Sequence, residues 1–190
     1  MIAKKLAPTW FCDSIYDINP DVLLKNNIKT IFFDLDNTLI PYYEELPYES
    51  TKKFVNYLKD KGLNIYVISN NHEDRVSKFS NDLGCKYSFM SFKPLTFKLN
   101  KFIKKENLNK DEIVIVGDQI LTDIICSKGL KIKSVLVTPA CKGDLKKTKV
   151  NRFFDNIIRK KQVKKGYLIK FERSDYYEQK RRIILLWMWS

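Results

Sequence analysis

The chain has 190 residues, 44% of them hydrophobic and 30% charged, with a formal net charge of +13, which is typical of one folded domain with a substantial core. Its four cysteines lie far apart without a C-x-x-C pair, and its one histidine disfavours a Ser-His-Asp triad. These features exclude a secreted disulfide framework, a zinc knuckle and a His-rich metal site, so we expect a reducing, cytoplasmic location.

Apolar runs alternate with segments of helical periodicity from about residue 29 to residue 160. Strands this apolar, each followed by an amphipathic helix, predict an α/β fold with a parallel sheet covered by helices on both faces. A further helix is expected between the last two strands. The expected strands are Ile28–Phe33, Asn64–Ser69, Tyr87–Met90, Glu112–Val116 and Lys133–Thr138, and the expected helices are Glu49–Lys61, the segment from Asn71 to Gly84, and 95–106.

No linker or repeat divides the first part of the chain, so we expect one domain over residues 1–165. The pattern becomes mixed after that point. We treat residues 166–190 as a basic and apolar C-terminal extension whose structure the sequence leaves open.

Polar side chains follow several of the expected strands, where parallel folds bind ligands. Asp34 and Asp36 are two positions apart in an extended segment and therefore point the same way. Two such carboxylates repel each other unless a cation lies between them. Mg²⁺ prefers oxygen ligands, and Asp118 after another strand could be a further ligand. Thr38, Ser69 and Lys93 could then bind an anionic group of a substrate.

Each of these residues also has a structural interpretation. Asp36 and Thr38 could cap the turn after the first strand, because both residue types hydrogen-bond to nearby backbone. A serine at a strand end, such as Ser69, is common, and Asp123 could be an ordinary helix residue. Turn capping does not explain why Lys93 and Asp118 follow other strands.

The segment Asp34-Leu35-Asp36-Asn37-Thr38-Leu39 resembles the first motif of the haloacid dehalogenase (HAD) superfamily of phosphohydrolases. Three further motifs follow in order: Ser69 after NIYVI, Lys93-Pro94, and Gly117-Asp118 with Asp123. The stretches LDNTLIPY, VISNN, FKP, VGDQILTD and LVTP, with the segment Asn151-Arg152-Phe153, are similar to the subclass III, YqeG-like family. That family is related to the phosphatidylglycerophosphate phosphatases of mitochondria. The resemblance covers residues 1–165 and implies a HAD-like Rossmannoid sheet.

The resemblance implies a two-step phosphoryl transfer. Asp34 would attack phosphorus and form an aspartyl-phosphate. Asp36 would protonate the leaving oxygen and then activate the hydrolytic water. Thr38 would hold Asp36 in place, while Ser69 and Lys93 would bind the phosphoryl oxygens.

The resemblance also implies a bound Mg²⁺ ion. Its ligands would be Asp34, the backbone carbonyl of Asp36, and Asp118. Asp123 would orient the lysine or a metal-bound water from outside the ligand shell, and Asn70 would assist at the substrate site.

The spacing of the motifs leaves no room for a cap domain. The gap from Leu39 to Ile68 is 30 residues and the gap from Asn70 to Phe92 is 23, enough for one helix each with loops. An open site suits a phosphate carried on something large, such as a lipid in a bilayer, a nucleic-acid end or a protein.

The positive charge is concentrated in residues 142–190, which hold 15 Lys and Arg and 5 Asp and Glu. This asymmetry favours an anionic partner, either an acidic membrane surface or RNA, although a solvated lysine-rich face explains it equally well. The segment Arg181–Trp189 pairs arginines with apolar and Trp residues, as interfacial segments do. The longest apolar run, Ile183–Trp189, has seven residues, far short of the roughly 20 of a transmembrane helix. We expect no transmembrane segment and at most a peripheral membrane attachment.

The leading hypothesis is a Mg²⁺-dependent HAD phosphatase that converts phosphatidylglycerophosphate to phosphatidylglycerol. One alternative keeps the chemistry but changes the substrate to a nucleotide, a sugar phosphate or a nucleic-acid end. The other is a non-catalytic factor that binds RNA or a GTPase.

Overall fold

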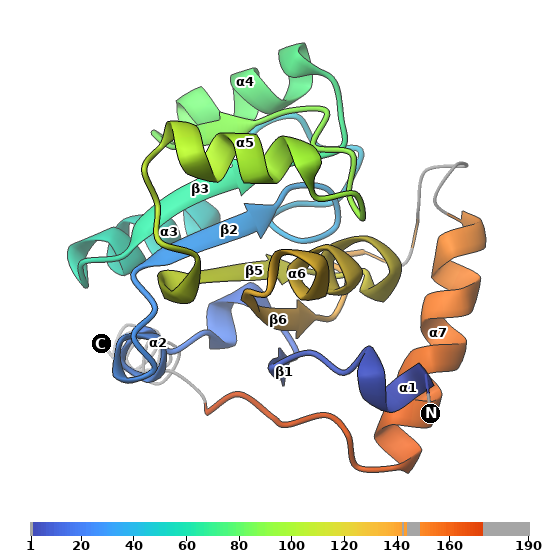
Figure 1. The fold of residues 1–190 in the computed structure, drawn as a ribbon. Coiled ribbons are helices and arrows are strands. Elements are labelled where there is room, and N and C mark those ends of the chain that lie inside the picture. Colours follow the sequence, from blue (N-terminus) through green and yellow to red (C-terminus); the bar gives the residue numbers. More distant parts are fainter. Residues whose placement is uncertain (1, 142, 144–148, 173–190) are drawn as a thin grey trace, which may run out of the picture.

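The computed structural model describes residues 2–141, 143 and 149–172. Six parallel strands form one sheet in the order β1-β6-β5-β2-β3-β4 (Figure 1). The two central strands, β5 and β2, are buried over their whole length, and most of their side chains are apolar on both sides of the sheet. The strands are β1 (Trp10–Cys12), β2 (Thr30–Asp34), β3 (Asn64–Ile68), β4 (Lys86–Ser88), β5 (Ile113–Gly117) and β6 (Lys133–Val137).

Helices connect the strands and lie on both faces of the sheet. They are α1 (Ile2–Lys5), α2 (Pro20–Lys25), α3 (Glu49–Asp60), α4 (Glu73–Asp82), α5 (Phe97–Lys105), α6 (Ile125–Leu130) and α7 (Lys149–Lys164). Short 3₁₀ turns occur at η1 (Ile15–Asp17) and η2 (Lys110–Glu112), and η3 (Ile120–Ile124) is a short π-helix that leads into α6.

Alternate residues of the strands feed two separate core clusters. Ile31 and Phe33 of β2 face a cluster that includes side chains of α2, α3 and α4. Phe32 between them faces a second cluster with α5 and α6. This period of two along a fully buried strand confirms the predicted parallel sheet with helices on both faces.

The register of the sheet brings the carboxyl ends of its strands to one edge. Asp34 at the end of β2 pairs with Ile68 of β3, and Gly117 at the end of β5 pairs with Leu136 of β6. The residues that follow these strands therefore lie side by side, which is where the polar clusters occur in the sequence.

The expected elements form within one or two residues of their predicted limits, and the helix expected between β5 and β6 appears as η3 followed by α6. The N-terminal elements α1, β1 and α2 had no counterpart among the expected elements. They are short, and β1 is a three-residue edge strand, so none of them leaves a periodic pattern in the sequence.

The described chain between the first and third motifs carries no inserted domain. Residues 35–48 contain only turns and an isolated bridge between Asp36 and Ile40, and residues 69–96 contain only α4 and β4 with their loops. The absence of a cap that the motif spacing predicts therefore holds over this fully described stretch.

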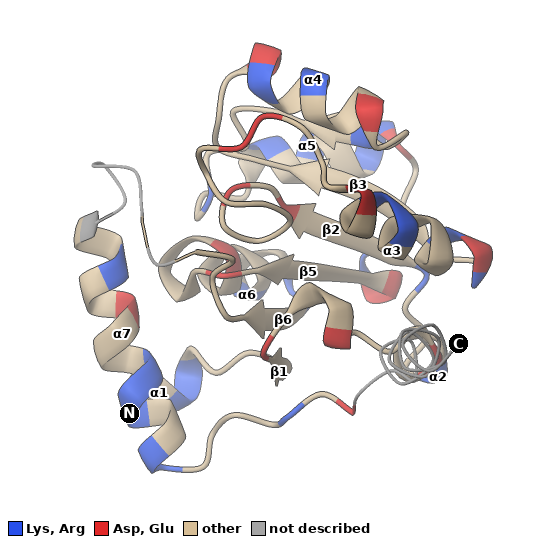
Figure 2. Ribbon diagram, turned by 180° about the vertical axis from the view of Figure 1, so that it is seen from behind, with Lys and Arg blue, Asp and Glu red and all other residues tan. Residues whose placement is uncertain are grey.

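Helix α7 lies beside α1 at the β1 end of the sheet, and Gln162 of α7 donates hydrogen bonds to the carbonyls of Ala3 and Leu6 at 3.0 Å each. Figure 2 shows Lys and Arg gathered on these two helices. The exposed lysines there are Lys4, Lys5, Lys160, Lys161 and Lys164. Within the described residues, no helix has the length and apolar character to cross a membrane.

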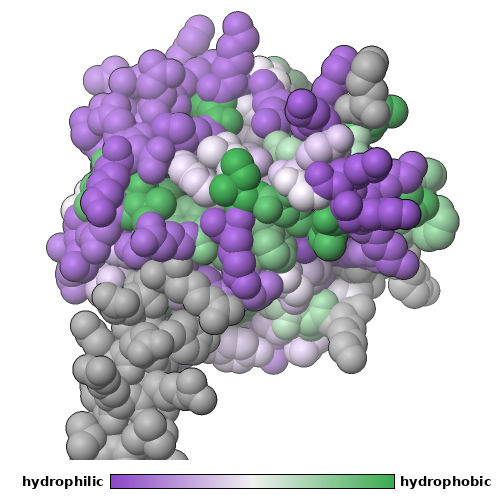
Figure 3. Space-filling model, turned by 90° about the horizontal axis from the view of Figure 1, so that it is seen from below, coloured by the Kyte–Doolittle hydropathy of each residue, from purple (hydrophilic) through white to green (hydrophobic). Residues whose placement is uncertain are grey.

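The described part of the C-terminal extension, residues 166–172, packs along β1. Phe171 is buried and its ring contacts Trp10 edge to face at 5.4 Å. Seen from below, the side on which β1 and this segment lie, the surface is mainly hydrophilic with apolar side chains gathered across the middle (Figure 3). The division at residue 165 stays a prediction, and the Arg181–Trp189 segment lies outside the described residues.

Candidate active site

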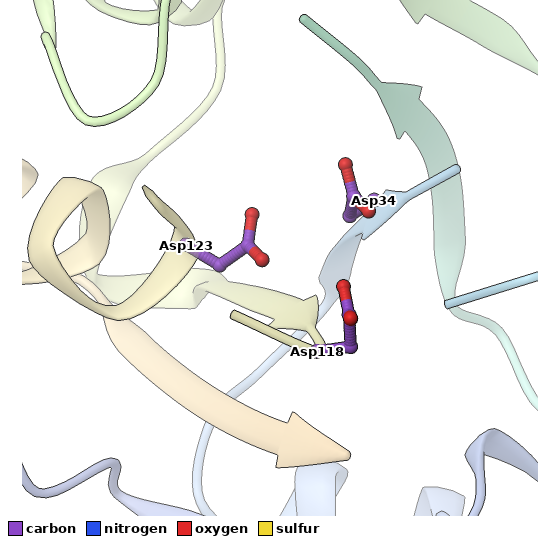
Figure 4. A group of neighbouring side chains, drawn as sticks. All are labelled: Asp34, Asp118 and Asp123. Atoms are coloured by element: carbon purple, nitrogen blue, oxygen red, sulfur yellow. The ribbon is translucent and has the colours of Figure 1, made fainter. Parts of the chain in front are cut away.

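Three buried aspartates converge at the carboxyl edge of the sheet (Figure 4). Asp34 ends β2, Asp118 directly follows β5, and Asp123 lies in η3. One carboxylate oxygen of each lies within 4.8 Å of the others. Three carboxylates this close and this buried repel one another strongly, so the arrangement requires positive charge between them.

Lys93 supplies part of that charge. Its Nζ lies 2.6 Å from Oδ1 of Asp34 and 2.6 Å from Oδ1 of Asp123, and its side chain is 2% exposed. Burial opposes the charged lysine, but the attraction of Asp123 and Asp34 outweighs burial and holds the pKa of Lys93 above its usual value. The lysine is therefore a permanent cation within the cluster.

Burial also dominates the two carboxyls at the strand ends. It raises the pKa of Asp34 well above its usual value, against the lowering effect of Lys93. It raises the pKa of Asp118 to about 6, against the lowering effect of Arg152. Each of these buried carboxyls is therefore stabilised by a bound proton or by a nearby cation, and a metal ion would be such a cation.

Gly117 is required for Asp123 to reach this position. A Cβ atom on Gly117 would lie 2.3 Å from the carboxyl carbon of Asp123, far inside contact distance. The other oxygen of Asp123 accepts the backbone N–H of Gln119 at 3.1 Å. The pairing of glycine and aspartate in the fourth motif therefore has a steric reason.

Thr38 lies between Asp34 and Asp118. Its Oγ1 is 3.2 Å from Oδ2 of Asp34 and 3.3 Å from Oδ1 of Asp118. The expectation that Thr38 would hold Asp36 was wrong, because the turn after β2 directs its hydroxyl inward. Asn37, with φ of +64°, forms that turn in the left-handed region that Asn tolerates well, and its N–H donates to the Ile40 carbonyl at 2.7 Å.

Asp36 is instead held by two residues of the next loop and helix. Nε and Nη2 of Arg75 donate to its Oδ1 at 2.9 and 2.6 Å, and Asn71 Nδ2 donates to its Oδ2 at 3.3 Å. Arg75 also donates to the Tyr42 carbonyl at 3.0 Å. Neither Arg75 nor Asn71 was among the predicted site residues. Asn71 and Arg75 are four residues apart and follow the second motif closely, and this spacing could have suggested that both lie at the site.

The remaining predicted residues lie in the loop after β3. The Ser69 side chain is buried and its Oγ accepts the N–H of Asn71 at 3.0 Å. Asn70 is exposed, and its side-chain amide clamps the backbone of Lys93, accepting from N–H at 2.7 Å and donating to C=O at 2.8 Å. Asn70 therefore fixes the lysine loop, and the substrate contact expected for it stays a prediction.

Helix α7 reaches the acidic cluster from outside the four motifs. Arg152 forms an ion pair with Oδ2 of Asp118 and donates to its backbone carbonyl at 3.2 Å. Arg159 donates to the same carbonyl at 3.1 Å. The segment Asn151-Arg152-Phe153 belongs to the family resemblance, but no role in the site was predicted for it.

The oxygen atoms of the cluster fit a hard divalent cation. Oδ2 of Asp34 and Oδ1 of Asp118 share a single hydroxyl proton, that of Thr38, so one of these buried oxygens lacks a donor at any moment among the described residues. An all-carboxylate donor set of this kind suits Mg²⁺. The expectation of a Mg²⁺ site is confirmed to this extent. Asp36 keeps its side chain outside the cluster, on Arg75, and a ligand role for its carbonyl stays a prediction.

This fold, with paired acidic loops and a buried lysine at one edge of a parallel sheet, defines a phosphohydrolase-type site. Residues 42–137 match the family described as haloacid dehalogenase-like hydrolase. The chain is also 30% identical over 168 residues to the "probable phosphatase YqeG" of Bacillus subtilis (strain 168), covering 88% of this chain and 98% of that one. The chain belongs to the haloacid dehalogenase-like hydrolases, and the prediction of a HAD-type phosphatase is confirmed at this level.

Solved structures with a related arrangement are more distant. A putative 3-deoxy-D-manno-octulosonate 8-phosphate phosphatase from Vibrio cholerae is 16% identical, with a TM-score of 0.49 over 78% of this chain and 94% of that one. The cobalt-bound deoxy-D-mannose-octulosonate 8-phosphate phosphatase from Haemophilus influenzae is 16% identical, with a TM-score of 0.46 over 73% of this chain and 91% of that one. Both are too distant to bear on the substrate of this chain.

Proposed function

We propose that this chain is a Mg²⁺-dependent phosphomonoesterase that works through an aspartyl-phosphate on Asp34. The observation that carries the proposal is the buried cluster at the ends of β2 and β5, in which Lys93 bridges Asp34 and Asp123 beside Asp118. It combines a carboxylate nucleophile, a fixed cation and a place for a metal ion, which are the parts that phosphoryl transfer uses.

In the first step, a carboxylate oxygen of Asp34 forms a bond to phosphorus while the bond to the leaving oxygen breaks. Asp36 donates its proton to that oxygen. In the second step, Asp36 accepts a proton from water, the water oxygen bonds to phosphorus, and the bond to Asp34 breaks. Phosphate leaves and both carboxyls return to their starting states.

The other residues bind the phosphoryl group. Lys93 and Ser69 contact its oxygens, and Thr38 donates from its position between Asp34 and Asp118. Mg²⁺ held by Asp34, Asp118 and the Asp36 carbonyl supplies charge neutralisation at the phosphoryl oxygens when bound. Asn70 and Asp123 act on Lys93, through its backbone and its ammonium group respectively.

The proposed substrate is phosphatidylglycerophosphate at an anionic membrane surface on the cytoplasmic side. Two features support it: no cap covers the described loops over residues 35–96, and exposed lysines gather on α1 and α7. A terminal phosphate on a lipid headgroup can enter such an open site while the basic helices face the bilayer. Each Lys or Arg near an anionic surface contributes about 1 kcal/mol to association.

Phosphate release from phosphatidylglycerophosphate in mixed micelles tests this proposal. We expect release with Mg²⁺, none with EDTA, and a loss of at least about a thousandfold in Asp34→Asn, because that variant lacks the nucleophile. Asp21→Asn, the same change at an exposed position on α2, is the matched control and should retain full activity.

The other results separate the alternatives. Asp34-dependent release from an aryl phosphate but not from the lipid would keep the chemistry and reject the lipid. Release from neither substrate, with salt-dependent RNA binding, would replace the enzyme by a non-catalytic binding factor.

A further inference from the structure

Three side chains on one face of α7 contact the loop after β5. Arg152, Asp155 and Arg159 are spaced three and four residues apart, so their side chains project on the same side. Arg159 donates to the Asp118 and Val137 carbonyls at 3.1 Å each.

Asp155 contacts the part of this loop that follows Asp118. It is 1% exposed, and its two oxygens accept the backbone N–H groups of Ile120 at 3.2 Å and Leu121 at 3.0 Å. Those groups lie at the start of η3, where a helix leaves its first N–H donors without partners of its own. The whole stretch from Asp118 to Leu121 is therefore held by one helix.

Arg152 acts on the carboxylate of Asp118 as well as on its backbone. One guanidinium nitrogen pairs with Oδ2 and the other donates to the carbonyl of the same residue at 3.2 Å. A fork of this kind fixes both the position and the rotation of a side chain, which one point contact cannot do. With Oδ2 engaged, Oδ1 of Asp118 points toward Thr38 and the adjacent Oδ2 of Asp34.

We propose that Arg152 is a positioning residue for the metal site: from α7 it holds Asp118 so that Oδ1 faces Asp34 and would be available to a Mg²⁺ ion. This inference rests on the proposed function, since it assumes that the acidic cluster binds Mg²⁺. It adds α7 to the four motif loops as a fifth part of the site.

Mg²⁺ binding to the full chain without substrate, measured by isothermal titration calorimetry, tests the inference. Loss of a partner that orients a metal ligand typically costs 10- to 100-fold in metal affinity, so we expect Arg152→Gln to weaken Mg²⁺ binding by about that factor. Arg152→Lys keeps the charge but loses the fork, and its affinity should lie between the two. Lys101→Gln on α5, an exposed site remote from the cluster, removes the same charge and should bind as the wild type does.

Two further readouts distinguish positioning from a general loss of structure. Guanidinium ion added to Arg152→Ala should restore part of the lost Mg²⁺ affinity, which it would not do for a misfolded protein. With an aryl phosphate, the kcat of Arg152→Gln should approach that of the wild type as Mg²⁺ is raised, while KM stays unchanged.

Two outcomes would overturn the inference. Mg²⁺ affinity of Arg152→Gln equal to the wild type would show that Asp118 needs no support from Arg152. A higher affinity would show that the arginine competes with the ion for Asp118. In either case wild-type binding that disappears in Asp118→Asn leaves the proposed function standing, whereas a wild type that binds no Mg²⁺ refutes the proposed function itself.

Discussion

Asp36 stands apart from the other acidic residues because it faces a different cation. Lys93 and Arg152 contact the buried cluster, whereas Arg75 contacts Asp36 through two nitrogens at a half-buried position. The general acid proposed here is thus oriented by α4, through a helix residue that also hydrogen-bonds to the Tyr42 carbonyl. A group that transfers protons must lie at a fixed distance from the leaving oxygen, so this support has catalytic value.

We expect Arg75→Gln to lower the kcat for an aryl phosphate by about 10- to 100-fold, because Asp36 loses its fixed orientation while the metal cluster keeps all its contacts. Steady-state kinetics at saturating Mg²⁺ measures this effect. Lys78→Gln is the control: it removes an exposed lysine that lies on α4 like Arg75 and pairs with Glu45, and it should change kcat little. An unchanged kcat in Arg75→Gln would argue that Asp36 needs no partner from α4.

The sequence could place the residues at the ends of strands and in the loops after them, and it could not place those that reach the site from helices. Asp34, Lys93 and Asp118 meet because parallel strands end at one edge, a consequence of the fold class alone. Arg75 and Arg152 arrive through the rotation of α4 and α7 about their axes, which depends on packing. Thr38 was assigned to the wrong aspartate because the direction of its hydroxyl depends on the left-handed turn at Asn37.

At the scale of elements, α7 is attached to the sheet mainly by polar contacts. Its described apolar contribution to the core is small, with Ile158 packed beside Ile120 and Leu136. Asp155 is the most buried among the charged side chains of α7 that the structure describes, and burial is the main cause that raises its pKa to about 6.

That pKa makes the attachment of α7 sensitive to pH. A carboxyl whose pKa is higher in the folded chain than the 3.8 of the free group binds its proton more tightly when folded. Its stabilising contribution is therefore complete below about pH 4 and is lost as the pH rises through 6. We expect the free energy of unfolding of the wild type to fall by about 2 kcal/mol relative to Asp155→Asn between these pH values. Urea denaturation of both proteins across this range measures the difference, and parallel curves would contradict it.

The elements themselves differed in how well the sequence predicted them. β2, β5 and α3 are long enough to carry a clear period, and they form where expected. β1 and α1 are stabilised by contacts with α7, β6 and residues 169–171, which are more than a hundred positions away. No local pattern encodes such contacts, so these elements could not be derived from their own residues.

At the scale of the whole molecule, the exposed lysines of α1 and α7 are distinct from the buried groups of the active site. The lysines of α1 and α7 lie at one end of the sheet (Figure 2) and are exposed, while Lys93, the cation within the acidic cluster, is buried. Salt screens exposed charges far more than buried ones, with a screening length of about 10 Å at 0.1 M. Partner binding and catalysis should therefore respond differently to ionic strength.

We expect binding to vesicles containing phosphatidylglycerol to weaken at least tenfold when NaCl is raised from about 0.05 to about 0.5 M. Hydrolysis of a soluble aryl phosphate should change little over the same range, because the groups that bind phosphate are buried. Co-sedimentation with vesicles measures the first quantity, and vesicles of phosphatidylcholine alone should not bind. Retention on those neutral vesicles, or binding that is insensitive to salt, would contradict the role of the lysines.

The pairing of β1 with residues 169–171 has a consequence for how the protein is made. Phe11 donates its N–H to the Ile169 carbonyl at 2.8 Å, and its own carbonyl accepts the N–H of Phe171 at 2.7 Å, so β1 is completed by a segment that is synthesised much later. A ribosome delivers the chain from the N-terminus at about 5–20 residues per second. The pairing of β1 with residues 169–171 can therefore form only about ten to thirty seconds after β1 has been synthesised.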